Sequence, residues 1–322
     1  MPAEPELAEL DLAEIELAEI MDKTKEYLSK AKAQNTVKGY RTDFLQFKTW
    51  CEQYQLPYLP TNDQTYALYL SSLAIDGAKM STIRRKMSSI AQAHSLSGHP
   101  SPTTAQIKAV WSGIRRVHGT AETGKQPILI DTLKLMLGVL PDKLLGVRDK
   151  ALLLIGFAGA LRRSELVNLD VEHITVTKEG LTLLIVSSKT DQEAKGETIG
   201  IPYGANDETC PVKAYVAWIK EAGIVNGPIF RPINRHNQVS DKRLSDKAVA
   251  LVVKRYVEAI GLNKDDYAGH SLRSGLATTA AMQGKSERSI MKQTRHRSDA
   301  MVRKYIRMGS LFIENAASGI GL

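Results

Sequence analysis

Hydrophobic residues recur every three or four positions between residues 22 and 117, a spacing that places them on one face of successive helices. The first of these stripes consists of Val37, Tyr40, Phe44, Phe47 and Cys51. Prolines and capping residues divide the segment into short helices, which are expected to begin near Asn35, Asp63, Ser81 and Ser101. The aromatic residues fall on the hydrophobic faces, so we interpret them as core residues and predict a small all-α module.

The period of the hydrophobic pattern changes in the second half of the chain. Helical spacing continues over 131–140 and 147–160, and alternation of apolar and polar residues then replaces it. The alternating segments, 174–176, 181–187 and 197–201, predict a small three-stranded antiparallel sheet. Helical spacing returns at Pro211, and the predicted helices are 211–222, 245–260, 271–283, 286–294, 298–307 and 310–317. The second module is therefore expected to be mainly helical with one inserted sheet.

The composition between the two patterns indicates a domain boundary. Residues 118–127 are rich in Gly, Thr and Pro, which is typical of a linker. The helical module before it spans residues 22–117, and the second module spans residues 128–322. Residues 1–21 form a separate acidic tail, whose five-residue quasi-repeat fits neither a helix stripe nor a strand.

Charge is distributed unevenly along the 322 residues. The net charge is +8, but residues 1–21 contain seven acidic residues and no basic ones. The rest of the chain has 43 basic residues against 28 acidic ones and carries +15. Such a charge indicates a polyanionic partner, of which nucleic acid is the commonest. A basic surface that only confers solubility is the alternative.

Several classes of protein are excluded by composition. No apolar run reaches the roughly 18 residues of a membrane span, and the first residues lack the basic segment of a secretory signal. Two cysteines, Cys51 and Cys210, make neither a disulfide framework nor a Cys-based zinc site. We therefore expect a cytoplasmic protein without membrane association, metal or cofactor.

Charged residues that interrupt apolar segments are the first candidates for chemistry. Arg162 follows an almost entirely apolar helix, where an unpaired charge is unfavourable, so its partner is either Glu165 or an external phosphate. His270 and Arg273 lie three residues apart at a predicted helix start. This spacing places them on one face, beside backbone N–H groups that favour an anion. Taken singly, such pairs also occur at ordinary surface sites.

Three further residues complete an ordered set. Lys189 lies at the tip between two predicted strands, and His296 precedes Tyr305 by nine residues. The set in chain order is Arg162, Lys189, His270, Arg273, His296 and Tyr305. With the contexts Ala160-Leu-Arg-Arg-Ser-Glu-Leu166 and His270-Ser-Leu-Arg273, it resembles the tyrosine recombinases, or phage-type integrases, a family that includes Cre and the Xer proteins. The resemblance covers nearly the whole chain from about residue 22.

This resemblance implies a fold. The chain would be mainly α, with an N-terminal helical, SAM-like core-binding domain over 22–117 and an α-rich catalytic domain over 128–322. The catalytic domain would contain the small three-stranded antiparallel sheet and have the DNA breaking-rejoining fold. A C-terminal exchange helix after Tyr305, over 310–317, would dock on a neighbouring subunit, and the alternative is that it folds back on its own domain.

The resemblance also implies a covalent mechanism. Tyr305 would attack a DNA phosphate, form a 3′-phosphotyrosyl link and release a 5′-hydroxyl, and strand exchange would pass through a Holliday junction without metal or ATP. Arg162, Arg273 and His296 would contact the non-bridging oxygens of the phosphate, where charge increases in the transition state.

Proton transfer in such a reaction needs two more groups. His270 would accept the proton of Tyr305, since an imidazole exchanges protons near neutral pH. Lys189 would donate a proton to the departing 5′-oxygen, and Lys195 is the second choice for this role. Glu165 would orient a neighbouring arginine or histidine without reacting itself.

The implied partner is double-stranded DNA with a paired inverted-repeat target site. The protein would be a monomer in solution and a homotetramer on DNA. Both domains would hold the duplex, chiefly through phosphates. The candidate contacts are Lys38, Arg41, Arg84, Arg85 and Lys86 in the first domain and Arg243, Lys247 and Lys254 in the second.

One residue departs from the family pattern. Arg295 precedes His296, where the family usually has glycine. Either the turn is built differently, or Arg295 adds a phosphate contact. A DNA-binding accessory protein with modified catalysis is therefore one alternative function, and a relaxing enzyme similar to type IB topoisomerases is another. A metal-dependent nuclease is disfavoured, because no Asp/Glu/His cluster has ligand spacing.

Overall fold

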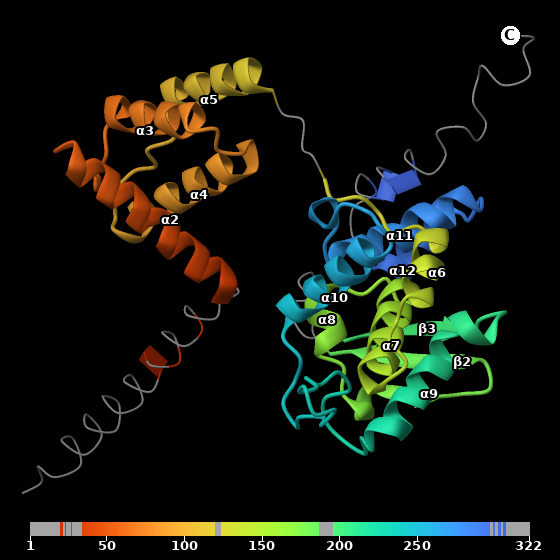
Figure 1. Ribbon diagram of the computed structural model, residues 1–322. Helices are drawn as coiled ribbons and strands as arrows, with labels where there is room; N and C mark the ends of the chain where they lie inside the picture. The colour runs from red at the N-terminus through yellow and green to blue at the C-terminus, as the bar shows by residue number, and fades with distance from the viewer. Residues whose placement is uncertain are drawn as a thin grey trace, which may run out of the picture. The chain divides into compact units, whose positions relative to one another are not determined.

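The computed structural model describes residues 20, 21, 23, 27, 34–119, 124–186, 196–296, 299, 302, 303, 305 and 306. The chain divides into two compact units, Met1–Glu122 and Thr123–Leu322, which Figure 1 shows with their helices labelled. The division falls inside the segment 118–127 that we expected to be a linker. Among the described residues, no helix is long and apolar enough to cross a membrane.

Four helices form the first unit between residues 34 and 119. They are α2 (Gln34–Gln53), α3 (Asp63–Ile75), α4 (Met80–Leu96) and α5 (Ala105–His118). The side chain of Asn62 caps α3, and that of Thr104 caps α5. Phe47 and Tyr69 are buried in the core, with ring centroids 4.8 Å apart. The stripe on α2 is confirmed at Phe47 and Cys51 but not at Val37, which lies in the first turn and is 48% exposed.

The second unit is mainly helical, as the helical spacing before and after the predicted strands indicated. Its helices are α6 (Ile130–Gly138), α7 (Leu144–Ala158), α8 (Arg163–Val167), α9 (Pro211–Ala222), α10 (Asp246–Ala259), α11 (His270–Met282) and α12 (Glu287–Thr294). Of the predicted helix 298–307, residues 299, 302, 303, 305 and 306 are described and helical, and the predicted helix 310–317 lies outside the described residues. The apolar helix α7 is buried over most of its length and lies beside α9 and α11 (Figure 1).

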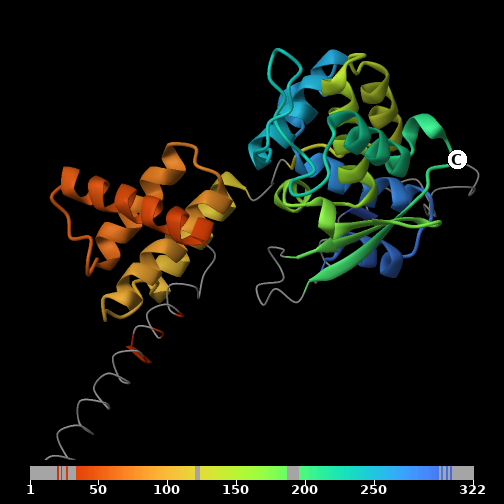
Figure 2. The same cartoon turned by 90° about the horizontal axis from the view of Figure 1, so that it is seen from below.

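The predicted three-stranded antiparallel sheet is confirmed. It consists of β1 (Ile174–Val176), β2 (Gly180–Ile185) and β3 (Glu197–Pro202), in the order β1-β2-β3. Leu183 lies at the centre, paired with Ile174 on one side and Ile199 on the other. These three side chains are buried, so the alternation in the sequence corresponds to one face turned toward the core. Figure 2 shows strands of the sheet side by side.

A close backbone approach fixes the position of α11. A Cβ atom at Gly275 would lie 1.9 Å from the carbonyl oxygen of Ile128, so only glycine allows this contact. The backbone N–H of Ile128 in turn donates to the carbonyl of Ser271 at 2.9 Å. The first turn of α11, which carries His270 and Arg273, is therefore held against the start of the second unit.

Candidate active site

The first arginine of the ordered set is held by an acid one helical turn away. Arg162 directly precedes α8, and Glu165 lies in the first turn of that helix. One oxygen of Glu165, Oε2, accepts the backbone N–H of Arg162 at 2.8 Å, and Oε1 accepts its guanidinium at 2.5 Å. Burial alone would raise the pKa of Glu165, but Arg295 and the hydrogen bonds from Arg162 together lower it. Glu165 is thus a buried, ionised partner of Arg162.

The second arginine joins the turn that follows α7 to the end of α12. Arg273 has no exposed surface, and its guanidinium donates to the carbonyl of Ala160 at 2.6 Å and to that of Thr294. Carbonyls at helix C-termini have no partner within the helix, so a guanidinium satisfies them well. Burial and the neighbouring Arg162 lower the pKa of Arg273 to about 9, which still leaves it charged at neutral pH. The site therefore contains two fixed positive charges.

The phenol of Tyr305 meets an imidazole from α11. The Oη atom of Tyr305 lies 3.0 Å from Nε2 of His270. Burial raises the pKa of Tyr305, although Arg273 opposes the shift, so the phenol is neutral near pH 7. Burial, followed by the charges of Arg273 and Arg162, lowers the pKa of His270. A neutral imidazole thus faces a neutral phenol at hydrogen-bond distance, the arrangement that general-base catalysis requires.

The second histidine lies close to the same ring. The ring centroids of His296 and Tyr305 are 5.9 Å apart, and Nδ1 of His296 contacts Oγ1 of Thr294 at 2.7 Å. Burial and the surrounding positive charges, Arg273 first among them, lower the pKa of His296 to about 4. His296 is therefore neutral at physiological pH in this structure.

The residue that departs from the family pattern keeps the backbone conformation of a glycine. Arg295 ends α12 with φ 54° and ψ 41°, in the left-handed region. Its side chain is buried and turns inward, and its guanidinium lies 2.6 Å from Oε2 of Glu165. The turn is therefore conventional, and Arg295 contacts protein groups on the inner side of the site.

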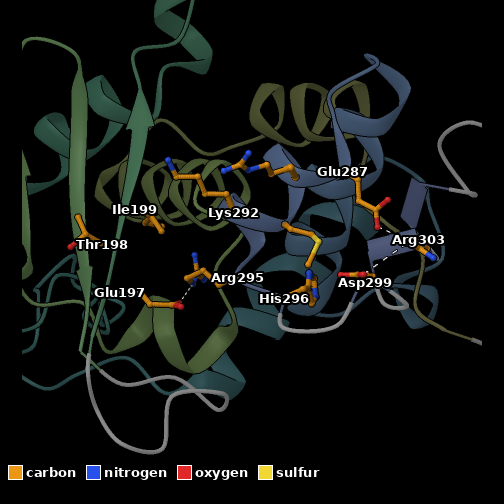
Figure 3. Close-up of a pocket in the computed structure, with 11 residues that line it drawn as sticks. Glu197, Thr198, Ile199, Glu287, Lys292, Arg295, His296, Asp299 and Arg303 are labelled. Carbon is orange, nitrogen blue, oxygen red and sulfur yellow. Dashed lines mark hydrogen bonds and ion pairs between the residues drawn. The ribbon is translucent and has the colours of Figure 1, made fainter.

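A pocket of about 810 Å³ lies beside this cluster, between β3 and α12 (Figure 3). Arg295 and His296 both line it, and Glu197 from β3 faces Arg295 with an N–O distance of 3.7 Å. On the opposite side, Arg303 pairs with Glu287 at 3.1 Å. The lining combines charges of both signs.

Two of the predicted catalytic residues lie in a part of the chain that the structure does not describe. Lys189 and Lys195 lie outside the described residues, between the ends of β2 and β3. In the part of the chain that the structure describes, no group of three or more His, Cys, Asp and Glu side chains could hold a metal ion.

The candidate DNA contacts of the first unit differ in availability. Lys38, Arg41 and Arg84 are exposed, and Arg85 is exposed but bound to Asp43 through two hydrogen bonds of 2.8 and 3.0 Å. Lys86 is a correction to the expected set. It is buried, and its amine lies 3.3 Å from the hydroxyl of Tyr69 and donates to Gln46. Lys86 therefore belongs to the interior of the unit.

One cation that the sequence did not single out joins this surface. A pocket of about 550 Å³ between α4 and α5 is lined by Arg84, Arg85 and Arg115. The guanidinium of Arg115 stacks over Trp111, 6.0 Å from the ring centroid. The packing of α4 against its neighbours brings these arginines together, so no spacing in the sequence indicated that Arg115 lies beside Arg84 and Arg85.

The three candidates in the second unit are partly engaged by protein groups. Arg243 binds the carbonyl of Val167 at 2.7 Å and Asp170 at 2.6 Å. Lys254 pairs with Asp265 at 2.8 Å, and Lys247 is exposed. Of the three, Lys247 is the most accessible to a phosphate.

Comparison with known proteins gives one consistent result. Residues 129–310 match the model of the phage integrase family, and residues 22–95 match that of the phage integrase N-terminal SAM-like domain. A protein of Selenomonas ruminantium named "Integrase/recombinase xerD homolog" is 44% identical over 299 residues, which cover 91% of this chain and 87% of the relative.

Solved structures show the same fold at low sequence identity. The XerH site-specific recombinase bound to palindromic difH substrate is 17% identical, with a TM-score of 0.60 and coverage of 80% of this chain and 72% of that one. The Tn1549 transposon integrase in complex with transposon right end DNA is 14% identical, with a TM-score of 0.62 and coverage of 88% and 92%. The expected fold class is thereby confirmed.

Proposed function

Because the chain belongs to the phage integrase family, we propose that it is a site-specific DNA recombinase that cleaves and rejoins strands through a covalent link to Tyr305. The observation that carries this proposal is the 3.0 Å contact between the Tyr305 hydroxyl and His270, next to the half-buried Arg162 and the buried Arg273. Site-specific recombination is the activity for which the family is known. The residue roles and intermediates below are our proposal.

The first step exchanges one phosphoester bond for another. The Tyr305 oxygen attacks phosphorus, and its proton passes to Nε2 of His270. A bond forms between phosphorus and the phenolic oxygen while the bond to the 5′-oxygen breaks, which leaves a 3′-phosphotyrosyl link and a free 5′-hydroxyl. Since an aryl phosphate is a good leaving group, a 5′-hydroxyl from a second duplex can reverse the step. Two such exchanges pass through a Holliday junction.

Positive charge stabilises the phosphorane-like transition state. Arg162 and Arg273 present guanidinium donors to the non-bridging oxygens, so the proposed chemistry needs neither a metal nor ATP. Arg273 has no exposed surface, so its contact with a phosphate would require the side chains around it to move. The neutral ring of His296 can donate from Nε2 when its Nδ1 accepts a hydrogen bond. The hydroxyl of Thr294 supplies that bond when it turns from the Ile290 carbonyl toward Nδ1.

Two supporting roles complete the proposal. Lys189 protonates the departing 5′-oxygen from the segment between β2 and β3, with Lys195 as the second choice. Glu165 orients Arg162 without reacting, which agrees with its burial and its two contacts to that residue.

The remaining features describe the assembly. We propose that the helical domain 22–117 and the catalytic domain 128–322 hold double-stranded DNA with inverted repeats, and that four chains pair two sites. The C-terminal segment 310–317, outside the described residues, would dock on a neighbour. A monomer in solution and a cytoplasmic location are part of the same proposal.

A suicide substrate separates this function from its alternatives. The probe is a duplex element selected by binding from a random-sequence pool and nicked near the cleavage position, so that the released fragment diffuses away and the covalent complex accumulates. Covalent capture rules out an accessory protein without catalysis. Exchange of strands between two intact elements, and not relaxation alone, rules out a topoisomerase-like enzyme. The absence of any covalent complex would overturn the proposal.

We expect an acidic limb in the cleavage rate that His270 sets. The pKa of His270 is lowered by burial and by neighbouring arginines, so the imidazole stays neutral down to pH values below its ordinary 6.5. As pH falls through this lowered pKa, the ring gains a proton and cannot accept the one on Tyr305. Single-turnover cleavage at subsaturating DNA, measured between pH 5 and 8, should therefore fall toward acid pH with a midpoint below 6.5. A midpoint above 6.5, or an unchanged limb in His270→Gln, would contradict this role.

We expect the arginine pocket of the first unit to contact DNA phosphates. Arg84→Ala and Arg115→Ala should each weaken DNA binding and reduce the slope of log affinity against log salt by about 1. Cleavage at saturating DNA should be unchanged, because neither residue belongs to the second unit. Lys48→Ala, which removes a cation that lies outside the pocket, is the matched control. Fluorescence anisotropy at several salt concentrations provides the test, and an unchanged slope in both variants would refute the contact.

A further inference from the structure

Arg295 occupies a position that is unfavourable for a residue with a side chain. Its φ of 54° is in the left-handed region, where Cβ crowds the following carbonyl. Ala160, whose carbonyl the guanidinium of Arg295 approaches at 3.5 Å, also has a positive φ, of 46°. Two strained residues thus meet at one contact. Strain of this kind persists where surrounding interactions hold the residue in place.

The guanidinium of Arg295 provides such interactions. It donates to the carbonyls of Gly159 at 3.2 Å and Gln293 at 3.1 Å, and to Oε2 of Glu165 at 2.6 Å. These groups belong to the end of α7, the end of α12 and the first turn of α8. Arg295 therefore links the segment that leads into Arg162, the helix that carries Glu165 and the segment that leads into His296. Arg273 binds the first and the last of these segments through the carbonyls of Ala160 and Thr294.

The contact with Glu165 determines how that acid meets Arg162. Oε2 is occupied by Arg295 and by the backbone N–H of Arg162, so only Oε1 faces the Arg162 guanidinium. The described bond from that guanidinium to Glu165 uses NH1. Without the Arg295 guanidinium, Oε2 would keep only the backbone N–H of Arg162 and could also accept from the Arg162 guanidinium, which gives the two-oxygen geometry that arginine and carboxylate prefer. Such a pair would withdraw donors from an incoming phosphate.

We propose that Arg295 is a positioning residue for strand cleavage: by holding Oε2 of Glu165, it limits this acid to a single contact with Arg162 and leaves the remaining donors of Arg162 for the scissile phosphate. The inference rests on the proposed function. Arg295 itself does not touch DNA. The buried side chain thus has a catalytic effect that acts through Glu165, and glycine at this position would supply the turn alone.

The test separates positioning from folding and from binding. Arg295→Ala keeps Cβ, and with it the strain of the turn, but removes the guanidinium. Arg295→Gln, which retains a neutral hydrogen-bond donor, serves as the test variant if the alanine variant is poorly folded. Arg303→Ala removes a cation from the neighbouring pocket and is the matched control, since the ion pairs that Arg303 forms with described residues go to Glu287 and Asp299. For each variant, we would measure the melting temperature, the Kd for the selected duplex and the single-turnover rate of covalent capture at saturating DNA.

We expect Arg295→Ala to slow covalent capture by about 10- to 100-fold while Kd changes less than about 2-fold. Arg295→Gln should lie between alanine and wild type. Glu165→Ala combined with Arg295→Ala should be no slower than Glu165→Ala alone, because one residue acts through the other.

Three results would overturn the inference. If the wild-type chain cleaves DNA, an Arg295→Ala variant of equal rate, or additive losses in the double variant, would refute positioning through Glu165 and leave the proposed function standing. A wild-type chain that forms no covalent complex would overturn the proposed function, and the inference with it.

Discussion

Replacement of Tyr305 by phenylalanine is expected to abolish covalent capture of DNA, with a loss of about 10⁴-fold or more in the cleavage rate. The change removes the one oxygen that the proposed mechanism places on phosphorus. The ring itself is 7% exposed and packs against Ala277, Ile290 and Val302, and phenylalanine keeps these contacts. Denaturing gel electrophoresis of the suicide-substrate reaction measures the loss, and an unchanged Kd shows that DNA binding survives.

The matched control is Tyr203→Phe. Tyr203 is 44% exposed, and its hydroxyl lies 3.5 Å from the carbonyl of Thr177, outside the proposed site. This variant should cleave at the wild-type rate. Cleavage and rejoining by Tyr305→Phe at a comparable rate would show that another group is the nucleophile.

Arg162→Ala is expected to lower covalent capture by about 10³-fold, because it removes a guanidinium from the phosphate and from the transition state. The fold should tolerate the change. Glu165, the buried acid that Arg162 pairs with, still has Arg295 at 2.6 Å, so no uncompensated charge remains in the interior. Single-turnover kinetics at saturating DNA and thermal unfolding together measure the two effects.

The adjacent Arg163 supplies the control for this variant. Its side chain is 42% exposed and lies 3.7 Å from Asp246, and it takes no part in the proposed chemistry. Arg163→Ala should therefore reduce cleavage at saturating DNA by less than about 3-fold. Equal losses in the two variants would indicate that a general loss of positive charge, and not the position of Arg162, controls the rate.

Much of the fold was predictable because its signals are local. The apolar run of α7 and the alternation in β1 to β3 each depend on neighbours in the sequence, whereas α5 begins at Ala105 with Thr104 as its cap, a few residues after the expected start near Ser101. Errors occurred where tertiary packing decides. Val37 continues the helical period of α2 but is exposed, and Lys86 follows two exposed arginines but points into the core.

The candidate site shows the same division. The residues of the ordered set were identifiable from their contexts, but the sequence could not show that Oη of Tyr305 meets Nε2 of His270, 35 residues away. It also left open whether Arg295 faces the phosphate or the protein. That choice depends on contacts to Glu165 and Gly159, which lie 130 and 136 residues earlier in the chain.

The most direct test of the account is the chemical identity of the covalent link. Protein trapped on the suicide duplex is digested with protease and nuclease, and the modified peptide is sequenced by mass spectrometry. We predict a single adduct in which Tyr305 carries the 3′-phosphate of the cleaved strand, with a free hydroxyl on the 5′ side. An adduct on any other residue, or a link to the 5′ end of the DNA, would contradict the account.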